Sequence, residues 1–279
     1  MALFTGCATA LITPFKEGAV DYKAFEALVE EQIAAGVDAL VVAGTTGEPA
    51  TMGMEEHEAV IRFVVNQTAG RVPVIAGAGG NATSEAIELA QRAKNAGADA
   101  QLCVTPYYNK TSQAGLVANY HAIANATDLP IIVYNVPSRT GLNITPATLE
   151  KIVAHPNVVA VKEANPDVAQ AAEKIRRCGD KVDFYSGNDD LIVPLMALGF
   201  KGVISVLSNP MPKETVAMTK AALAGDFATA GREQLRLLPF INSLFLETNP
   251  IPVKAAMALM GKCEDELRLP LVPMQEEPR

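Results

Sequence analysis

The sequence predicts an α/β protein, namely a single (β/α)8 TIM barrel with a C-terminal helical extension. Eight short apolar runs alternate with helical patterns, and a glycine motif recurs where helices end. No GxGxxG fingerprint follows the first apolar run, which disfavours a doubly wound open sheet. The length of 279 residues suits one barrel, so we assign residues 1–224 to the barrel and 225–279 to the extension.

The apolar runs have the character of buried parallel strands. Most are nearly continuous apolar segments, as expected of strands that helices cover on both faces. The eight predicted strands are Cys7–Ile12, Ala39–Ala43, Val74–Ala76, Ala100–Val104, Pro130–Tyr134, Val158–Val161, Val182–Tyr185 and Gly202–Val206. Predicted helices include Tyr22–Ala35, Glu55–Thr68, Ser84–Ala96 and Gln113–Ala126, and, after the last strand, Pro212–Ala224, Phe227–Leu246 and Pro252–Met260.

A short repeat marks the helix ends. Ala-Gly-Val-Asp-Ala around Gly36 and Ala-Gly-Ala-Asp-Ala around Gly97 are nearly the same motif, and Gly199 lies in a weaker third copy. In each copy we expect the helix to end at a glycine in the left-handed conformation, with a strand directly after it. The first two glycines are 61 residues apart, which fits two βα units.

Composition excludes several classes of function. With 23 basic and 31 acidic residues the net charge is −8, which disfavours binding to nucleic acid or to an anionic membrane. No apolar run reaches the roughly 20 residues that span a bilayer, and the N-terminus lacks the basic region of a secretory signal. The four cysteines form no CxxC pair and the three histidines are isolated. We therefore expect a cytoplasmic protein with reduced cysteines and without a metal site.

The carboxyl ends of the predicted strands carry the most unusual polar residues, and this is where barrel enzymes place their active sites. Lys162 directly follows the buried pattern Val158–Val161. Desolvation there lowers the pKa of the ammonium group, and the free amine can form a Schiff base with a ketone. The alternative is a lysine just clear of the strand that pairs with Glu163 or another carboxylate. Position alone does not choose between these interpretations.

Other strand ends offer further groups, each with a structural alternative. Tyr134 can face Lys162 and shuttle protons, or it can be an ordinary core tyrosine. The small-residue loop Gly44–Gly47 suits a carboxylate or oxyanion, although many tight turns look similar. Arg139 can grip a substrate carboxylate, or it can be an exposed loop arginine. The adjacent pair Tyr107–Tyr108 can instead pack a loop or a subunit contact.

Taken together, the motifs are far more specific than their parts. They resemble the dihydrodipicolinate synthase family, within the pyruvate-dependent class I aldolases, from Thr5 to about Pro270. The matching motifs are Gly44–Glu48, Val104–Asn109, Tyr134–Gly141, Val161–Ala164, Gly202–Val206 and Asn249–Lys254.

The resemblance implies a reaction and a set of roles. It implies that pyruvate forms a Schiff base on Lys162, without a separate cofactor, and then condenses with aspartate 4-semialdehyde on the diaminopimelate route to lysine. Tyr134, Thr45 and Tyr108 would form a hydroxyl relay, with Tyr108 reaching in from a neighbouring subunit of a homotetramer, a dimer of dimers. Thr46, Gly187 and Ile204 would bind pyruvate, and Arg139 would bind the carboxylate of the aldehyde.

The resemblance also implies a regulatory site for lysine. Positions that bind the inhibitor lysine in many members are matched by Ala50, His57, Asn81, Glu85 and Tyr107. Pro49 replaces a serine and Met54 a histidine, so we expect weak or moderate inhibition. The tail Gln275–Arg279 is too short and polar for the last helix that many relatives carry.

Two alternative functions stay open. A sister aldolase, such as N-acetylneuraminate lyase or a 2-keto-3-deoxy sugar acid aldolase, is the nearest alternative. A non-catalytic keto-acid-binding barrel is the alternative of another class.

Overall fold

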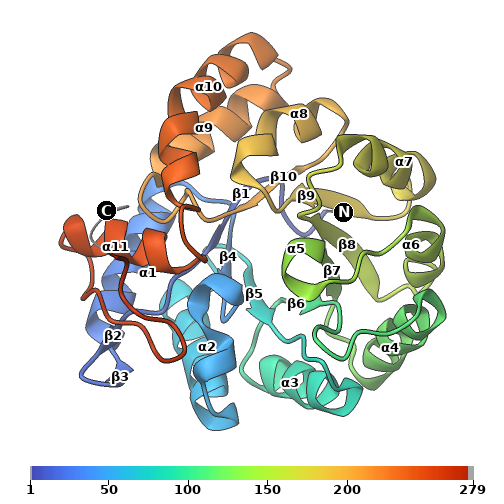
Figure 1. Cartoon of the computed structure of the whole chain (residues 1–279), viewed down its shortest axis with the longest axis horizontal. Helices are drawn as coiled ribbons and strands as arrows, with labels where there is room; N and C mark the ends of the chain where they lie inside the picture. The colour runs from blue at the N-terminus through green and yellow to red at the C-terminus, as the bar shows by residue number, and fades with distance from the viewer. Residues whose placement is uncertain (1, 276–279) are drawn as a thin grey trace.

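The computed structural model describes residues 2–275, and in it eight parallel strands close a barrel (Figure 1). Around the barrel the strands follow the order β1-β10-β9-β8-β7-β6-β5-β4. The (β/α)8 prediction is therefore confirmed. The barrel strands are β1 Gly6–Ala10, β4 Ala39–Val42, β5 Val74–Gly77, β6 Ala100–Val104, β7 Ile131–Asn135, β8 Val158–Glu163, β9 Asp183–Ser186 and β10 Gly202–Ser205. A small hairpin, β2 Phe15–Lys16 and β3 Ala19–Val20, lies outside it.

The helices follow the predicted pattern closely, because apolar periodicity and capping residues agree. Asp21, Ser112 and Asp167 accept a backbone N–H at the starts of α1, α4 and α7. The helices are α1 Tyr22–Ala35, α2 Met54–Thr68, α3 Thr83–Asn95, α4 Gln113–Ala126, α5 Pro137–Thr140, α6 Pro146–Ile152, α7 Val168–Cys178, α8 Ile192–Ala197, α9 Pro212–Leu223, α10 Phe227–Ser243 and α11 Ile251–Leu259. Short 3₁₀ turns occur at Thr45–Gly47, Pro49–Thr51 and Asp189–Leu191.

The repeated glycines behave as expected. Gly36, Gly97 and Gly199 have φ angles of +84°, +91° and +103°, a region that side chains with a Cβ rarely adopt. Each glycine reverses the chain from a helix towards the next barrel strand. The recurring motif is therefore the turn chemistry of the βα repeat.

One strand differs from its prediction in a way that matters for the site. We predicted that the sixth strand ends at Val161, but β8 continues through Lys162 and Glu163, which are both buried. Ladder pairing with β7 continues at Tyr134–Lys162 and Asn135–Glu163. The predicted strand ended too early because charged residues are rare in buried strands, yet Glu163 has a buried ion-pair partner here. Glu163 accepts a hydrogen bond from Lys174 Nζ at 2.6 Å, so its partner is Lys174, and the alternative in which Glu163 pairs with Lys162 does not hold.

Two apolar layers form the core. The inner cluster fills the barrel and includes Tyr134, Ala160, Tyr185 and Ile204. The outer cluster lies between strands and helices and contains buried Cys7, Cys103 and Cys178. All four cysteines are free thiols, and Cys263 is the one that is only partly buried.

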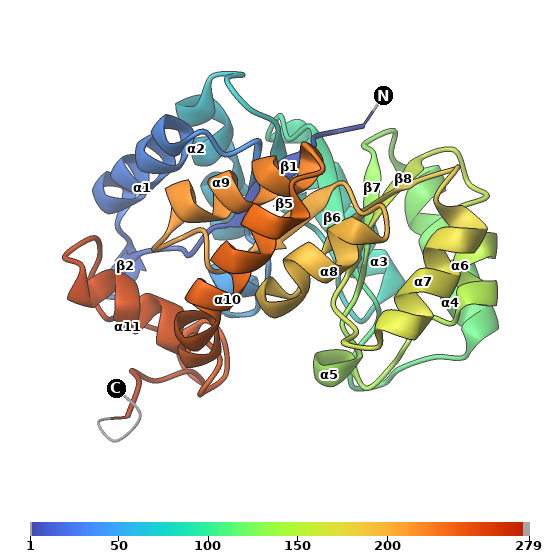
Figure 2. The same ribbon diagram turned by 90° about the horizontal axis from the view of Figure 1, so that it is seen from above.

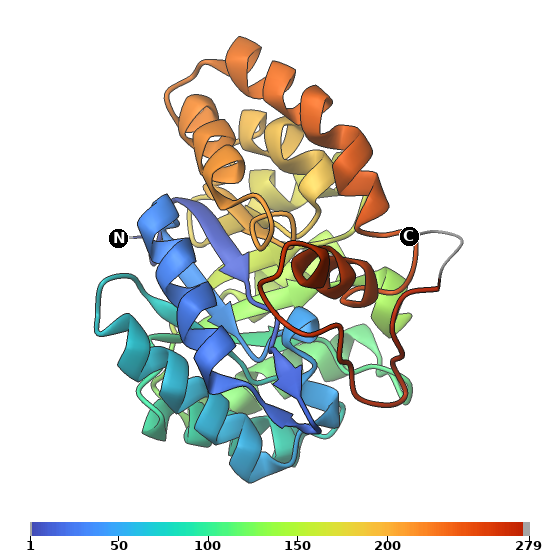
Figure 3. The ribbon, with the colours of Figure 1, turned by 90° about the vertical axis from the view of Figure 1, so that its left-hand side faces the viewer.

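The last helices have two different environments. Helix α9 contacts β1 and α1 and so completes the ring of helices, whereas α10 packs on α9 and α8. Helix α11 lies on the same side of the barrel as α5 (Figure 2), and the loop after it lies beside the β2–β3 hairpin (Figure 3). The boundary at residue 224 stays a prediction. Of the predicted tail, residues 276–279 lie outside the described residues.

Within residues 2–275, none of the helices has the length and apolarity that a bilayer crossing needs.

Candidate active site

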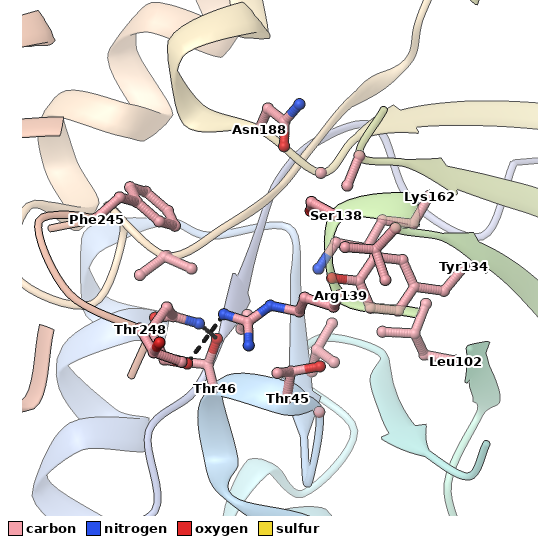
Figure 4. A pocket seen from close by; sticks show the side chains of 18 of the residues that line it. Thr45, Thr46, Leu102, Tyr134, Ser138, Arg139, Lys162, Asn188, Phe245 and Thr248 are labelled. Carbon is pink, nitrogen blue, oxygen red and sulfur yellow. Dashed lines mark hydrogen bonds between the residues drawn. The ribbon is translucent and has the colours of Figure 1, made fainter. Parts of the chain in front are cut away.

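A pocket of about 700 Å³ opens at the carboxyl ends of the strands (Figure 4). Its walls come from the loops after β4, β7, β8 and β9 and from residues 245–249 between α10 and α11. Six of the predicted site residues line this pocket. They are Thr45, Thr46, Tyr134, Arg139, Lys162 and Gly187.

Lys162 and Tyr134 form the centre of the pocket. They are opposite each other on β8 and β7, and Lys162 Nζ lies 4.4 Å from the centre of the Tyr134 ring. Both side chains are more than nine-tenths buried. Alternation along a strand sends Tyr134 and Lys162 into the barrel and their neighbours Asn135 and Glu163 towards the helices. The ladder register therefore fixes this pair.

Burial changes the acidity of Lys162. It lowers the pKa of the Lys162 ammonium from 10.5 to about 8; nearby Asp189 opposes this shift and Arg139 adds to it. Burial raises the pKa of Tyr134, while Arg139 and a hydrogen bond with Thr45 act in the opposite direction. An amine that is partly free near neutral pH lies beside a protonated phenol that is linked to a hydroxyl. This arrangement suits attack on a carbonyl with local proton transfer.

Gly187 provides room for the lysine. A Cβ at this position would lie 2.7 Å from Ala164 Cβ and 3.1 Å from Lys162 Cε. Any side chain there would displace Lys162 or the end of β8. Gly187 therefore shapes the pocket through the absence of a side chain.

The Thr45–Gly47 loop and Arg139 form the opposite wall. Thr46 is buried and accepts a hydrogen bond from Asn249 Nδ2 at 3.0 Å. Arg139 belongs to the short helix α5, is exposed, and donates from Nη2 to the backbone oxygen of Asn249 at 3.0 Å. Figure 4 shows Arg139 extending between Lys162 and Thr46. An anion in the pocket would therefore meet a guanidinium and hydroxyl groups.

Two predicted site residues lie elsewhere. Tyr108 has a φ angle of +65°, is 91% exposed, and lines a neighbouring groove together with Tyr107 and Arg139. Ile204 is fully buried in the inner barrel cluster and does not line the pocket. Within this chain, neither side chain completes the site around Lys162.

Comparison with known proteins identifies the family. Residues 3–279 match the model of the dihydrodipicolinate synthetase family. The chain belongs to this family.

Individual relatives agree with this assignment. The 4-hydroxy-tetrahydrodipicolinate synthase of Geobacter sulfurreducens is 53% identical, over 98% of this chain and 94% of the relative. The crystal structure of dihydrodipicolinate synthase from Aquifex aeolicus superposes with a TM-score of 0.97 at 49% identity, covering 99% of this chain and 94% of that one. The chloride-inhibited enzyme from Acinetobacter baumannii, complexed with pyruvate, gives a TM-score of 0.96 at 44% identity, over 98% and 94% of the two chains. The predicted resemblance and the expectation of a lyase of the aldolase type are confirmed.

Of the residues that match the family's lysine site, some lie near one another around Tyr107. Glu85 lies close enough to Tyr107 to raise the pKa of its phenol, although burial is the larger cause. The backbone oxygen of Asn81 accepts from Asn109 Nδ2 at 3.2 Å, and Ala50 lines the same groove as Tyr107. His57 lies in α2, where burial lowers its pKa and its Nδ1 has no partner.

Sequence reasoning missed two residues of the site. Asn249 begins the matching motif Asn249–Lys254, for which the sequence predicted no role, yet it contacts Thr46 and Arg139. Asp189 follows β9 and was not among the predicted site residues. It is buried near Lys162, and its Oδ2 accepts hydrogen bonds from the backbone N–H groups of Val206 and Leu207.

Within residues 2–275, no group of three or more His, Cys, Asp or Glu side chains has an arrangement that would hold a metal ion.

Proposed function

We propose that the chain acts as a 4-hydroxy-tetrahydrodipicolinate synthase, condensing pyruvate with L-aspartate 4-semialdehyde through a Schiff base on Lys162. The observation that carries the proposal is the buried Lys162 against Tyr134, in a pocket that also presents Arg139. Membership in the family and the names of the relatives support it. The covalent adduct with pyruvate serves in place of a separate cofactor.

The proposed reaction begins and ends at Lys162. The free amine of Lys162 attacks the ketone of pyruvate and water leaves, which gives an iminium ion. Loss of a methyl proton converts the iminium ion into an enamine, whose carbon attacks the aldehyde of the second substrate. The amine of that substrate then attacks the iminium carbon, closes the ring and releases Lys162.

The other residues hold the substrates and move protons. Tyr134, linked to Thr45, relays protons to and from the carbonyl oxygens. Thr46 and the loop N–H groups bind the pyruvate carboxylate, beside Gly187. Arg139 binds the carboxylate of the aldehyde. Tyr108 of a second subunit would complete the relay, which makes a homo-oligomer, a dimer of dimers, part of the proposal. We place the enzyme in the cytoplasm, where its free cysteines stay reduced.

Borohydride trapping tests the proposal directly. Incubation with pyruvate and borohydride should add a reduced pyruvate group to Lys162, detected by peptide mass spectrometry. Lys162→Ala should give no adduct and lose nearly all turnover, because the covalent route is gone. An exposed lysine, Lys213→Ala, is the matched control and should trap normally. Trapping at another lysine would contradict the proposal. Turnover of sialic acid rather than aspartate 4-semialdehyde would assign the chain to a sister aldolase.

Regulation by lysine forms a second part of the proposal. Glu85 and Asn81 supply oxygens that suit an ammonium group, but Pro49 and Met54 offer neither the hydroxyl nor the imidazole of strongly inhibited members. We expect weak or moderate inhibition by L-lysine in steady-state assays. Glu85→Gln should weaken it further, because it removes the charge that pairs with the ammonium. Activity that stays unchanged in saturating lysine would contradict this prediction.

A further inference from the structure

We propose that Glu48 and Lys254 are positioning residues, whose buried ion pair holds Thr45 and Thr46 where these two side chains meet pyruvate. This inference rests on the proposed function, because both residues would act through Thr45 and Thr46. Glu48 and Lys254 each end a motif that matches the family. Neither has a part in the reaction derived above.

The ion pair between Glu48 and Lys254 is completely removed from water. Both side chains have an exposed fraction of 0%, and Glu48 Oε1 accepts a hydrogen bond from Lys254 Nζ. Glu48 Oε2 accepts the backbone N–H of Arg268 at 3.1 Å, and Lys254 Nζ lies 4.2 Å from the centre of the Phe15 ring. Both carboxylate oxygens therefore have donors from the chain after α10. Moving the two side chains apart would leave a buried charge unpaired, which is strongly unfavourable.

The backbone of Glu48 has a conformation that needs support from its surroundings. Its φ and ψ angles are +58° and +41°, a left-handed conformation that residues with a Cβ rarely adopt. Its N–H donates to the backbone oxygen of Thr45 at 3.2 Å, and its own oxygen accepts from the Thr51 hydroxyl at 3.0 Å. Such conformations persist where neighbouring structure holds them in place. The ion pair therefore supports the residue that ends the turn Thr45–Gly47.

The chain around the start of α11 contacts this turn at two points. Asn249, before the helix, donates from Nδ2 to Thr46 Oγ1 at 3.0 Å, and Lys254, within the helix, pairs with Glu48. The N–H of Lys254 donates to the backbone oxygen of Pro250 at 3.0 Å, so the helix relates the two contacts to each other. Two contacts fix the orientation of a short turn as well as its place. They therefore fix how Thr46 lies in the wall of the pocket.

A buried ion pair can also serve the stability of the fold alone, and the test separates the two roles. For each variant we would measure the urea midpoint by circular dichroism and the pyruvate concentration that gives half of the maximal rate of borohydride trapping. Lys254→Met leaves the carboxylate unpaired, and Lys254→Met with Glu48→Gln removes both charges. Glu48→Asp keeps both charges but shortens the side chain by one methylene. Lys16→Met is the control, because Lys16 forms an exposed ion pair with Glu264 of the same C-terminal segment.

The positioning role predicts that stability and pyruvate binding separate. Lys254→Met should lower the urea midpoint and raise the half-saturating pyruvate concentration about tenfold. The charge-free double variant should regain most of the midpoint, because no buried charge is unpaired, yet keep the weakened pyruvate binding. Glu48→Asp should raise the half-saturating concentration about threefold or more with a smaller change in midpoint than Lys254→Met. Lys16→Met should match the unaltered protein in both measurements.

Two results would overturn the assignment. One is pyruvate binding that recovers together with stability in the double variant, and the other is normal pyruvate binding in Glu48→Asp. Glu48→Asp decides the question even if the double variant fails to fold. Failure of the unaltered protein to trap pyruvate would instead overturn the proposed function, so the two failures are distinguishable.

Discussion

Lys162 owes its chemistry to its surroundings. A lysine side chain in water has a pKa of 10.5. Inside the barrel mouth, burial brings the pKa to about 8, and the opposing contributions of Asp189 and Arg139 adjust it. An amine in this range is partly unprotonated at neutral pH yet still accepts a proton when it leaves. Such tuning is what a Schiff-base lysine requires.

The pH dependence of trapping follows from this pKa. Below about pH 9, the rate of adduct formation with pyruvate should rise with pH, with a midpoint near pH 8, as the free amine is released. Arg139→Gln should move the midpoint to higher pH, because the guanidinium lowers the pKa of Lys162. Exposed Arg71→Gln is the control and should leave it in place. A midpoint near 10 in the unaltered protein, or one that Arg139→Gln does not move, would contradict this.

Strands β7 and β8 hold Lys162 and Tyr134 together through a hydrogen-bond network behind them. Glu163 is buried and accepts from Asn135 Nδ2 at 2.7 Å, from Lys174 Nζ at 2.6 Å and from the backbone N–H of Asn165 at 2.9 Å. Asn135 and Glu163 are the outward neighbours of Tyr134 and Lys162 on the same two strands. This network therefore ties together the ends of β7, β8 and α7 directly behind the site.

Removing one partner of the buried ion pair should be costly. Lys174→Met leaves the Glu163 carboxylate without a counter-charge and should destabilise the fold by about 3–5 kcal/mol. Lys174→Met with Glu163→Gln should recover part of that loss. The exposed pair of Lys94 with Asp128 is the control, and Lys94→Met should barely change stability. Urea unfolding followed by circular dichroism measures this, since the chain has no tryptophan. Equal effects in the two single variants would refute the role of burial.

Over the whole molecule, the segment after α10 holds the loop that carries Thr45 and Thr46. Glu48, directly after the Thr45–Gly47 turn, forms a fully buried ion pair with Lys254 of α11, and its Oε2 accepts the backbone N–H of Arg268 at 3.1 Å. Lys254 and Arg268 both lie over the ring of Phe15, at 4.2 and 4.1 Å. The chain beyond α10 thus braces the loop that carries Thr45 and Thr46.

Subunit mixing tests whether Tyr108 acts in the neighbouring site. Tyr108→Phe and Lys162→Ala should each be nearly inactive alone. In randomly mixed dimers, about half the molecules are hybrids, and one of their two sites then has an intact Lys162 and an intact partner Tyr108. Co-refolding should therefore recover about a quarter of the normal activity. No recovery in verified hybrids would show that Tyr108 does not act between subunits.

Local patterns were enough for the architecture. Apolar runs and glycine-ended helices predict the eight strands because both depend on residues close in sequence, and α1 and α4 begin and end where predicted. Lys162 and Tyr134 were found because each directly follows or ends an apolar run. The roles of Tyr108 and Ile204 came from the family resemblance, and they remain predictions.

The sequence by itself determined the barrel, its repeat and the chemical types at its mouth. Only the tertiary structure decided which of these groups touch. It paired Glu163 with Lys174 rather than Lys162, and it brought Asn249 to Thr46 across 203 positions of sequence. The reason is physical: periodicity reports which face of an element is buried, whereas partners depend on ladder register and on loops that meet only when the barrel closes. Burial, and with it the pKa of Lys162, arises at that same step.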